Sequence, residues 1–323
     1  MEEFADFEAY ITRVDPWGRR SGIVKIIPPK EWSVSDSLPP TKPLMPGVVL
    51  HSPIEQVMMG GQGLFRQQNI ERRKKMSIMD WSQHNDDNDG LDLSELTTEQ
   101  AAFYSSFKPQ SSWLPPDTQP SDYTPAACRE LERSFWRSCG IVKPAWYGAD
   151  MAGSLFSDPH TPWNVARLPS FLSRLTQGRP ISGVNTPYLY FGMWRATFAW
   201  HVEDMDLYSI NYIHWGAPKF WYAIPSEKAR TFENTMRNYF PGDRSQCPQF
   251  LRHKSYLASP SVLSPSCRPN TLVQHQGEFV VTFPNGYHAG FNLGLNCAES
   301  TNFALESWVQ LGRTAGVCRC VDD

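Results

Sequence analysis

Short runs of β-branched and aromatic residues, separated by turn signals, fill the second half of this chain of 323 residues. They predict strands at 188–193, 197–203, 206–214, 219–224 and 277–283. Helical patterns cover 126–138, 164–176, 226–240 and 301–314. Several short strands with helices outside them favour an antiparallel barrel or sandwich over a βαβ sheet. The sequence therefore predicts a mainly β fold with flanking helices.

Composition limits the class of protein. Hydrophobic residues make up 41% of the chain and charged residues 20%, as in packed globular proteins. A formal net charge of −3 gives no basic field, so no direct nucleic-acid site is expected. The N-terminus does not resemble a secretory signal, and the most apolar stretch, 188–200, is too short to span a membrane. Seven cysteines favour a reduced compartment, cytosolic or nuclear, with metal-bound or buried thiols.

The first half of the chain is less regular. A helical pattern over 4–14 is expected to stop at Asp15-Pro16, and a β-branched run follows at 22–27. Gly-Gly-Gln-Gly at 60–63 predicts a turn. Residues 82–125 are rich in Asn, Asp, Ser, Thr and Pro, which predicts a polar surface insertion. Its block 85–90 does not match a calcium loop, because Leu96 stands where a bidentate Glu is required.

His201 and Glu203 form a candidate metal-binding pair. Both lie in a predicted strand, where residues two apart point to the same face. His288, just after another predicted strand, would complete the two-histidine, one-carboxylate set of non-haem Fe(II) oxygenases. With eight His and 33 acidic residues, about one such pair arises by chance, and His84-Asn85-Asp86 is a visible decoy.

The surroundings of His201 favour the metal hypothesis over an ordinary surface histidine. An unpaired Glu in a buried space would be costly. The aromatic residues expected to enclose such a space are Trp200, Tyr208, Tyr212 and Trp215. A 2-oxoacid co-substrate would also need a cation and hydrogen bonds for its distal carboxylate. Lys219 and Asn211 on the next two strands, with Tyr147 before a Gly-Ala-Asp turn, are candidates for that role.

Cysteine and histidine residues form a second candidate metal site. Cys247 and His253 are close in sequence, as are Cys318 and Cys320. Together they make a closed Cys3His set suited to structural zinc, which would pin the C-terminus to the 247–253 loop. Buried thiols are the alternative reading. That alternative is preferred for the cysteines without a nearby partner, Cys128, Cys139, Cys267 and Cys297.

At these residues the sequence resembles the JmjC-domain lysine demethylases, in particular the subfamily that pairs JmjN with JmjC and carries a Cys3His zinc site. The matching blocks span nearly the whole chain outside 82–125. They are Ser21 to Trp32, Tyr147 to Ser154, Val184 to Trp194, Phe198 to Asn211, Phe250 to Lys254 and Gly286 to Phe303.

The resemblance implies a double-stranded β-helix, a cupin-like jelly roll, with an N-terminal JmjN α/β attachment and a C-terminal zinc site. It implies JmjN at 1–46, a mixed linker region at 47–154 with the insertion at 82–125, and the JmjC barrel at 155–323. By position, His201, Glu203 and His288 match the iron ligands. The 2-oxoglutarate residues are matched by Tyr147, Asn211 and Lys219, and the zinc ligands by Cys247, His253, Cys318 and Cys320. Residues that contact the substrate are matched by Gly183, Tyr190, Glu203, Ser300, Asn302, Asp150 and Asn69.

The activity implied is Fe(II)- and 2-oxoglutarate-dependent demethylation of tri- or dimethylated lysine 9 or lysine 36 of the histone H3 tail, in the nucleus. Hydroxylation of an N-methyl group would release formaldehyde, with succinate as co-product. Because hydrogen is taken from carbon, a trimethylated lysine can react. The alternatives are a 2-oxoglutarate-dependent hydroxylase of another protein or RNA, and a non-catalytic JmjC histone reader. The insertion at 82–125 resembles that of the family's fungal members, which slightly favours lysine 36. Asn285 and Trp215 depart from the usual pattern, away from the ligand positions.

Overall fold

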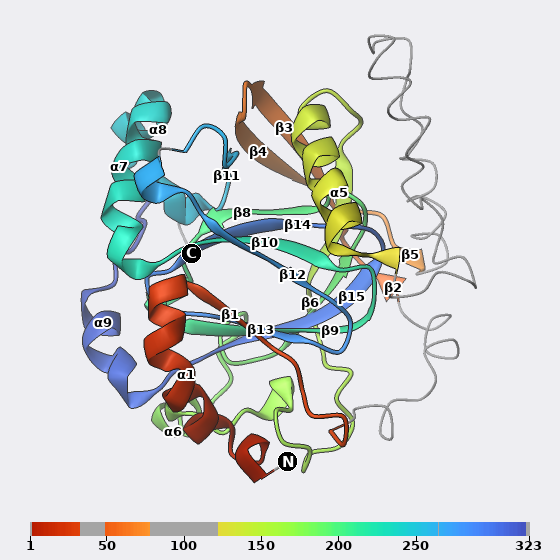
Figure 1. The fold of residues 1–323 in the computed structure, drawn as a ribbon, viewed down its shortest axis with the longest axis vertical. Coiled ribbons are helices and arrows are strands. Elements are labelled where there is room, and N and C mark those ends of the chain that lie inside the picture. The colour runs from red at the N-terminus through yellow and green to blue at the C-terminus, as the bar shows by residue number, and fades with distance from the viewer. Residues whose placement is uncertain (1, 33–48, 78–121, 264, 321–323) are drawn as a thin grey trace.

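The structure is a computed structural model that describes residues 2–32, 49–77, 122–263 and 265–320. Most strands of this part of the chain form two antiparallel sheets (Figure 1). The strands are β1 Ile23–Ile26, β2 Val49–Leu50, β3 Ile54–Gly61, β4 Leu64–Glu71, β5 Met76–Ser77, β6 Ala145–Ala152, β7 Tyr188–Gly192, β8 Thr197–His201, β9 Tyr208–Gly216, β10 Lys219–Ile224, β11 Tyr256–Ala258, β12 Asn270–Gln274, β13 Phe279–Thr282, β14 Tyr287–Asn292 and β15 Asn296–Phe303. The α-helices are α1 Phe7–Ser21, α5 Pro125–Ser138, α6 Phe171–Leu175, α7 Ala229–Tyr239, α8 Pro241–Gln246 and α9 Val309–Thr314.

The two sheets form the layers of the barrel. The larger has nine strands in the order β1-β13-β9-β15-β7-β6-β3-β4-β11, and the smaller has four in the order β12-β10-β14-β8. In Figure 1 the four-stranded sheet lies across the β1, β13 and β9 end of the larger sheet. Trp221 and Ala223 of β10 pack against Val280 of β13 and Ile23 of β1, which joins the layers through a small apolar cluster. The order of the strands, with neighbours far apart in sequence, is typical of a jelly roll.

The N-terminal unit is part of this body. Helix α1 begins after Asp6, whose carboxylate accepts a hydrogen bond from the Ala9 amide, and ends at Gly22 with φ 80°. Phe7 and Ile11 are buried in a core cluster with Trp163 and Phe303. Strand β1 then pairs with β13, so that the N-terminal unit extends the nine-stranded sheet.

The expected end of this first helix was wrong. Pro16 lies inside α1, which continues to Ser21. A proline in a helix removes one hydrogen bond and costs about 3 kcal/mol or more in isolation. Packing of both helix ends against the barrel, with the Asp6 and Gly22 caps, outweighs this local cost. Tertiary contact therefore overrides the sequence signal.

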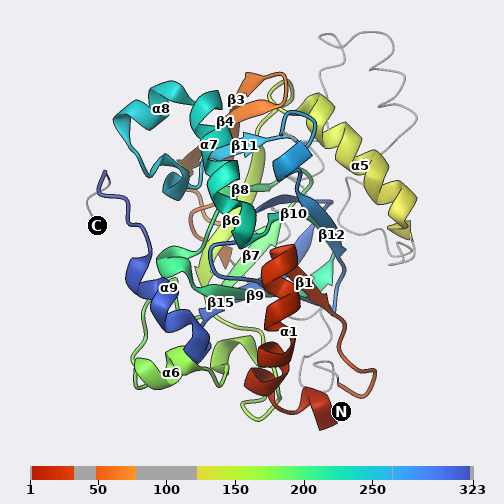
Figure 2. The same cartoon turned by 60° about the vertical axis from the view of Figure 1, so that its left-hand side comes forward.

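Helices cover the barrel from several sides (Figure 2). Helix α5 packs on the smaller sheet, where Phe135 stacks on Phe291 of β14 at a ring-centroid distance of 3.9 Å. In α7, Phe232 and Met236 are fully buried in the same cluster. Figures 1 and 2 both place α5 beside the β3–β4 hairpin and α7 next to α8. The predicted helices at 126–138 and 226–240 correspond to α5 and to a 3-10 turn followed by α7.

Two other predicted helices were wrong in extent. The 164–176 segment is a 3-10 turn, Val165–Arg167, and then a short α6 that begins after Ser170, because Pro169 interrupts the pattern. The 301–314 segment begins as the end of β15 and becomes helical only at Glu306–Trp308 and α9. Both faces of β15 are covered, so its polar residues give no alternation of hydropathy.

Strands from the region expected to be a linker belong to the larger sheet. β3 and β4 form a hairpin whose turn residues, Gln62 and Gly63, both have positive φ, as the Gly-Gly-Gln-Gly turn predicted. β6 pairs with both β3 and β7. The domain boundaries 1–46, 47–154 and 155–323 stay predictions. The insertion at 82–125, except its last four residues, and the block 85–90 lie outside the described residues.

Candidate functional site

Two strands of the smaller sheet bring the predicted iron ligands together. His201 ends β8, His288 lies in β14, and the two residues are direct cross-strand partners. Their ring centroids are 4.2 Å apart. Glu203 follows β8 in extended conformation, and its Oε1 lies 3.2 Å from Nε2 of His288. One donor atom from each of the three residues lies within 4.8 Å of the others, a spacing that one metal ion can bridge.

The histidine rings are oriented by the backbone. Nδ1 of His201 is 2.7 Å from the Ala199 carbonyl oxygen, and Nδ1 of His288 is 3.1 Å from that of Gly286. In the neutral tautomer, Nδ1–H donates to the carbonyl and Nε2 keeps its lone pair for a metal. Burial, followed by the His288 ring, lowers the pKa of His201 to about 3.

Glu203 is the anionic member of the set. Burial alone disfavours its ionised form, but hydrogen bonding and charge from His288, with charge from His201, prevail. The pKa of Glu203 therefore lies well below its usual value. Neutral imidazoles and an ionised carboxylate are the protonation states that bind a divalent cation. The donor set thus fits iron(II).

The cluster of His201, Glu203 and His288 opens into a cavity of about 380 Å³ between the two sheets. Every residue predicted to hold iron, 2-oxoglutarate or substrate lines it. Those residues are Asn69, Tyr147, Asp150, Gly183, Tyr190, His201, Glu203, Asn211, Lys219, His288, Ser300 and Asn302. The smaller sheet supplies His201, His288 and Lys219, and Glu203 follows its strand β8. The larger sheet supplies Tyr147, Tyr190, Asn211, Ser300 and Asn302.

Lys219 is a buried cation in this cavity. It is 1% exposed, and none of the ion pairs found among the described residues involves it. Its Nζ donates to Oδ1 of Asn292 at 2.6 Å and to the Tyr147 hydroxyl at 3.4 Å. Burial lowers the pKa of Lys219 to about 7. A buried ammonium with only neutral partners is suited to the carboxylate of a ligand.

Asn211 offers a second polar group at this end of the cavity. Its Oδ1 is buried, with no hydrogen-bond partner among the described residues. Its backbone carbonyl instead accepts from the Gln274 side chain at 3.1 Å. Burial raises the pKa of the Tyr147 phenol, which keeps its proton for donation. An amide, a phenol and an ammonium therefore converge where a co-substrate could lie.

The remaining predicted substrate residues lie on the other walls of the cavity. Ser300 Oγ donates to the Ile210 carbonyl at 2.9 Å, and Asn302 Nδ2 donates to that of Tyr208 at 3.1 Å. Ser300 thus has its hydroxyl hydrogen engaged and Asn302 one of its two amide hydrogens, and each keeps an oxygen that can accept. Gly183 has φ 72°, a conformation that favours glycine. Burial, followed by the Asp150 charge, raises the pKa of Tyr190.

The aromatic enclosure predicted around His201 was wrong. Trp200, Tyr208, Tyr212 and Trp215 all lie outside the cavity, in core clusters. Strand alternation explains the error along β9, because Ser209 and Asn211 face the cavity while Tyr208 and Tyr212 point to the opposite face. The aromatic residues that line the cavity are Tyr147, Tyr188, Tyr190, Phe198 and Trp221.

Sequence reasoning also missed several neighbours of the site. Asn292 holds Lys219 and lies four residues after His288 on the same face of β14, so strand periodicity could have found it. Lys254 lines the cavity next to His253 and pairs with Asp204 at 3.3 Å. His214 and Glu299 form a fully buried pair at 2.9 Å, with no comparable sequence signal.

The second predicted metal cluster is also assembled. Cys247 follows α8, His253 ends a 3-10 turn, and Cys318 and Cys320 lie near the C-terminal end of the described chain. Their donor atoms lie within 4.8 Å of one another. The backbone hydrogen bond from Cys320 is the largest of several contacts that lower the pKa of Cys318 to about 7, which favours the thiolate. The four other cysteines are buried thiols.

Comparison with known proteins agrees with this arrangement. A JmjN domain model matches residues 1–28, and a model described as "JmjC domain, hydroxylase" matches residues 188–303. The mainly β fold with flanking helices, a cupin-like JmjC domain and a JmjN domain is thereby confirmed. None of the helices in the described part of the chain is both long and apolar enough for a membrane crossing.

Three curated relatives are each 42% identical to this chain. They are lysine-specific demethylase 4B of Mus musculus, probable lysine-specific demethylase 4F of Homo sapiens and lysine-specific demethylase 4D of Rattus norvegicus. The matches cover 100%, 99% and 99% of this chain, and 27%, 45% and 56% of the respective relatives. The chain therefore spans only part of their length. It carries a JmjN and a JmjC domain and is similar over its whole length to these lysine-specific demethylases.

Proposed function

We propose that this chain is an Fe(II)- and 2-oxoglutarate-dependent demethylase of methylated lysine. The observation that carries the proposal is the shared cavity: the His201, Glu203 and His288 cluster and the buried Lys219 both line it. A metal site and an anion site in one cavity suit a co-substrate that chelates the metal and carries a distal carboxylate. When bound, iron and 2-oxoglutarate supply O2 activation and hydroxylation of an N-methyl group, with loss of formaldehyde.

The residues of the chain would then hold and orient the reactants. His201 and His288 present Nε2 atoms set by the Ala199 and Gly286 carbonyls, and Glu203 supplies the anionic ligand. Lys219 and the Tyr147 hydroxyl would grip the distal carboxylate of 2-oxoglutarate, with Asn211 beside it. Such fixed positions limit the freedom of the reacting groups, which is the main contribution that this protein scaffold can make.

The methylated ammonium would lie against oxygen atoms. Tyr190, Ser300, Asn302 and Glu203 supply them, since polarised C–H groups beside a cationic nitrogen make weak C–H···O contacts. An aromatic cage would bind the cation as well, but would not leave a methyl group aimed at the metal. Gly183 would allow close approach of the backbone. Asp150 and Asn69, also on the cavity wall, would contact the flanking peptide.

The substrate proposed is the histone H3 tail, methylated at lysine 36 or lysine 9, in the nucleus. The relatives named as lysine-specific demethylases support the substrate class, and the sequence resemblance supplies the finer assignment. Mass spectrometry of two trimethylated H3 peptides, incubated with iron and 2-oxoglutarate, tests it. Loss of methyl groups from either peptide supports the proposal. Succinate formation without loss from either would favour a hydroxylase of another target, and absence of both products would favour a reader.

We further propose that Cys247, His253, Cys318 and Cys320 bind structural zinc, so Cys318→Ser is expected to lose zinc and melt earlier. A serine hydroxyl is a poor zinc ligand, and without the ion the C-terminal segment is no longer fixed to the 247–253 loop. We expect the melting temperature to fall by roughly 5 °C or more. Metal analysis and thermal melting measure the two effects. The control is Cys128→Ser, which changes a buried thiol of α5 outside the cluster, and this variant should bind zinc like the unaltered protein. Unchanged zinc content in Cys318→Ser would refute this site.

The affinity for 2-oxoglutarate is expected to fall as pH rises above about 7. In the free protein the pKa of Lys219 is about 7, so the ammonium that binds the carboxylate is lost above that pH. Affinity should be greatest below pH 7 and decrease by up to about tenfold per unit above it. Calorimetric titration between pH ~6.5 and ~8.5 measures this. Lys219→Arg keeps its charge and should remove the dependence; a flat profile for the unaltered protein would contradict the assignment.

A further inference from the structure

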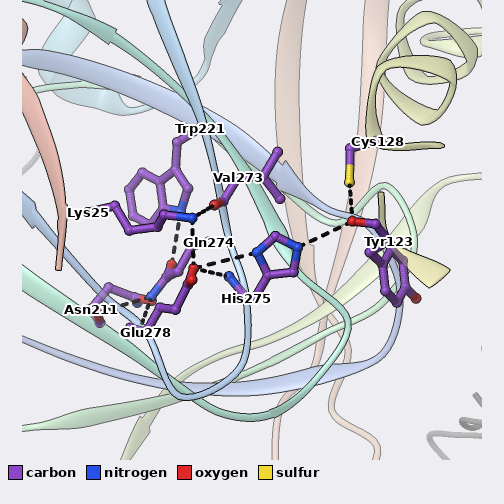
Figure 3. A network of polar contacts seen from close by, with 9 residues as sticks. All are labelled: Lys25, Tyr123, Cys128, Asn211, Trp221, Val273, Gln274, His275 and Glu278. Atoms are coloured by element: carbon purple, nitrogen blue, oxygen red, sulfur yellow. Dashed lines mark hydrogen bonds and ion pairs between the residues drawn. The ribbon is translucent and has the colours of Figure 1, made fainter. Parts of the chain in front are cut away.

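Gln274 connects the two sheets next to the cavity, although it does not line the cavity itself. It ends β12, is fully buried, and is the cross-strand partner of Lys219 in β10. Its side-chain Oε1 accepts from the Trp221 indole at 3.0 Å (Figure 3). Its Nε2 donates to the backbone carbonyls of Asn211 at 3.1 Å and Glu278 at 3.0 Å. Both side-chain amide hydrogens and the side-chain oxygen are thus directed at neighbours of the co-substrate site and at its own turn.

These contacts reach three residues that line the cavity, and the three come from both sheets. Asn211 belongs to the nine-stranded sheet, whereas Lys219 and Trp221 belong to the four-stranded sheet. The Trp221 ring lies 6.1 Å from that of His288, between centroids. A shift of Gln274 would therefore move Asn211 and Trp221 relative to each other. A displacement of about 1 Å in such groups is enough to weaken binding and catalysis.

The turn that follows Gln274 is held by the N-terminal unit. Lys25 of β1 donates to the Val273 carbonyl at 3.0 Å and pairs with Glu278 at 3.1 Å. Glu278 also accepts from the His275 amide at 2.8 Å, and the His275 ring lies 3.3 Å from the Tyr123 carbonyl. Figure 3 shows Lys25 and His275 both directed at the Glu278 carboxylate, with Gln274 beside them.

The ion pair is shielded enough to matter. The Lys25 and Glu278 side chains are 28% and 14% exposed, unlike the open Arg13 and Glu3 pair at 54% and 79%. Burial disfavours the Glu278 anion, but hydrogen bonds from His275 and Lys25 prevail and lower its pKa. Partly buried, multiply hydrogen-bonded pairs contribute more than exposed ones. Lys25 therefore fixes the turn to β1.

We propose that Gln274 is a positioning residue for the 2-oxoglutarate pocket, and that Lys25 of the JmjN unit, through Glu278, holds the turn that carries it. This inference rests on the proposed function. In this proposal the JmjN unit has a specific part in co-substrate binding, whereas a general packing role would affect both substrates alike. Loss of the Lys25–Glu278 ion pair should therefore weaken the binding of 2-oxoglutarate more than the binding of the methylated peptide.

The test compares Lys25→Met, Glu278→Gln, their double variant and Gln274→Met with the unaltered protein. Binding of 2-oxoglutarate to the anaerobic, Fe(II)-loaded protein is measured by calorimetry, and KM values are measured for both substrates. Lys25→Met and Glu278→Gln should each weaken 2-oxoglutarate binding by about fivefold, while the KM for the peptide and kcat stay within about twofold of the unaltered protein's values. The double variant should bind 2-oxoglutarate no more weakly than either single variant does. Lys25→Arg should retain binding, and Arg13→Met is the matched control of an exposed pair.

Each outcome is decisive. Folded Lys25→Met and Glu278→Gln proteins that bind 2-oxoglutarate normally would overturn the proposal, as would equal losses for both substrates. If Gln274→Met fails to fold, the two milder variants decide alone. An unaltered protein that takes up no 2-oxoglutarate would remove the proposed function itself, and this inference with it. Normal uptake by unaltered protein and variants alike would remove only the inference.

Discussion

His201→Ala is expected to abolish demethylation while leaving the fold intact. The substitution removes one of two imidazoles from a three-member set, and two remaining groups do not hold iron(II) in place. We expect turnover to fall by about 1,000-fold or more. The fold should survive because His201 lies at the end of β8, and its one side-chain hydrogen bond among the described residues is to the Ala199 carbonyl. Formaldehyde release and thermal melting measure the two effects.

His160→Ala is the matched control for this variant, since His160 is an exposed histidine away from the cavity. It should turn over substrate like the unaltered protein. Retained demethylation by purified, iron-loaded His201→Ala protein would contradict the assignment of His201 as an iron ligand. A collapse of the melting temperature in that variant would instead show that the residue is needed for folding.

Lys219→Met is expected to lose 2-oxoglutarate binding without losing stability. The ammonium is buried with only neutral partners, so its removal costs the apo protein little and leaves a hydrophobic chain of similar length. The carboxylate of bound 2-oxoglutarate would then be buried without its counter-ion. We expect affinity to fall by roughly 100-fold or more. Calorimetry on Fe(II)-loaded protein measures the affinity, and a melting temperature equal to or above that of the unaltered protein is expected.

Lys74→Met, the same change at an exposed lysine, is the control for Lys219→Met and should bind 2-oxoglutarate normally. A Lys219→Met protein with unaltered affinity would show that another cation grips the distal carboxylate. Lys254 would then be the residue to examine, because it also lines the cavity.

Much of the site could be predicted because its groups follow local rules. His201 and Glu203 are two residues apart at the end of a strand, where alternation directs both to one side. Cys318 and Cys320 have the same spacing near the end of the chain. The partners His288 and His253 were reached by residue type and family resemblance, and the structure brings them within ligand distance. What these groups hold remains a proposal.

The features that were missed depend on tertiary contacts. Pro16 signals a helix end, yet α1 continues because its two ends pack on the barrel. β15 has both faces covered, so its residues show no strand period, and the pattern predicts a helix from residue 301 although the strand continues to Phe303. Gln274 looks like an ordinary polar residue before a Gly-containing turn. Only the strand order places it between Asn211 and Trp221.

The most direct test of the account is a coupled measurement of formaldehyde and succinate. The full chain, with Fe(II), 2-oxoglutarate and O2, is incubated with a trimethylated H3 peptide or with its unmethylated counterpart. The account predicts one formaldehyde for each succinate with the methylated peptide, and only slow, uncoupled succinate with the other. Succinate formation that the methylated peptide does not stimulate, with no formaldehyde, would contradict it.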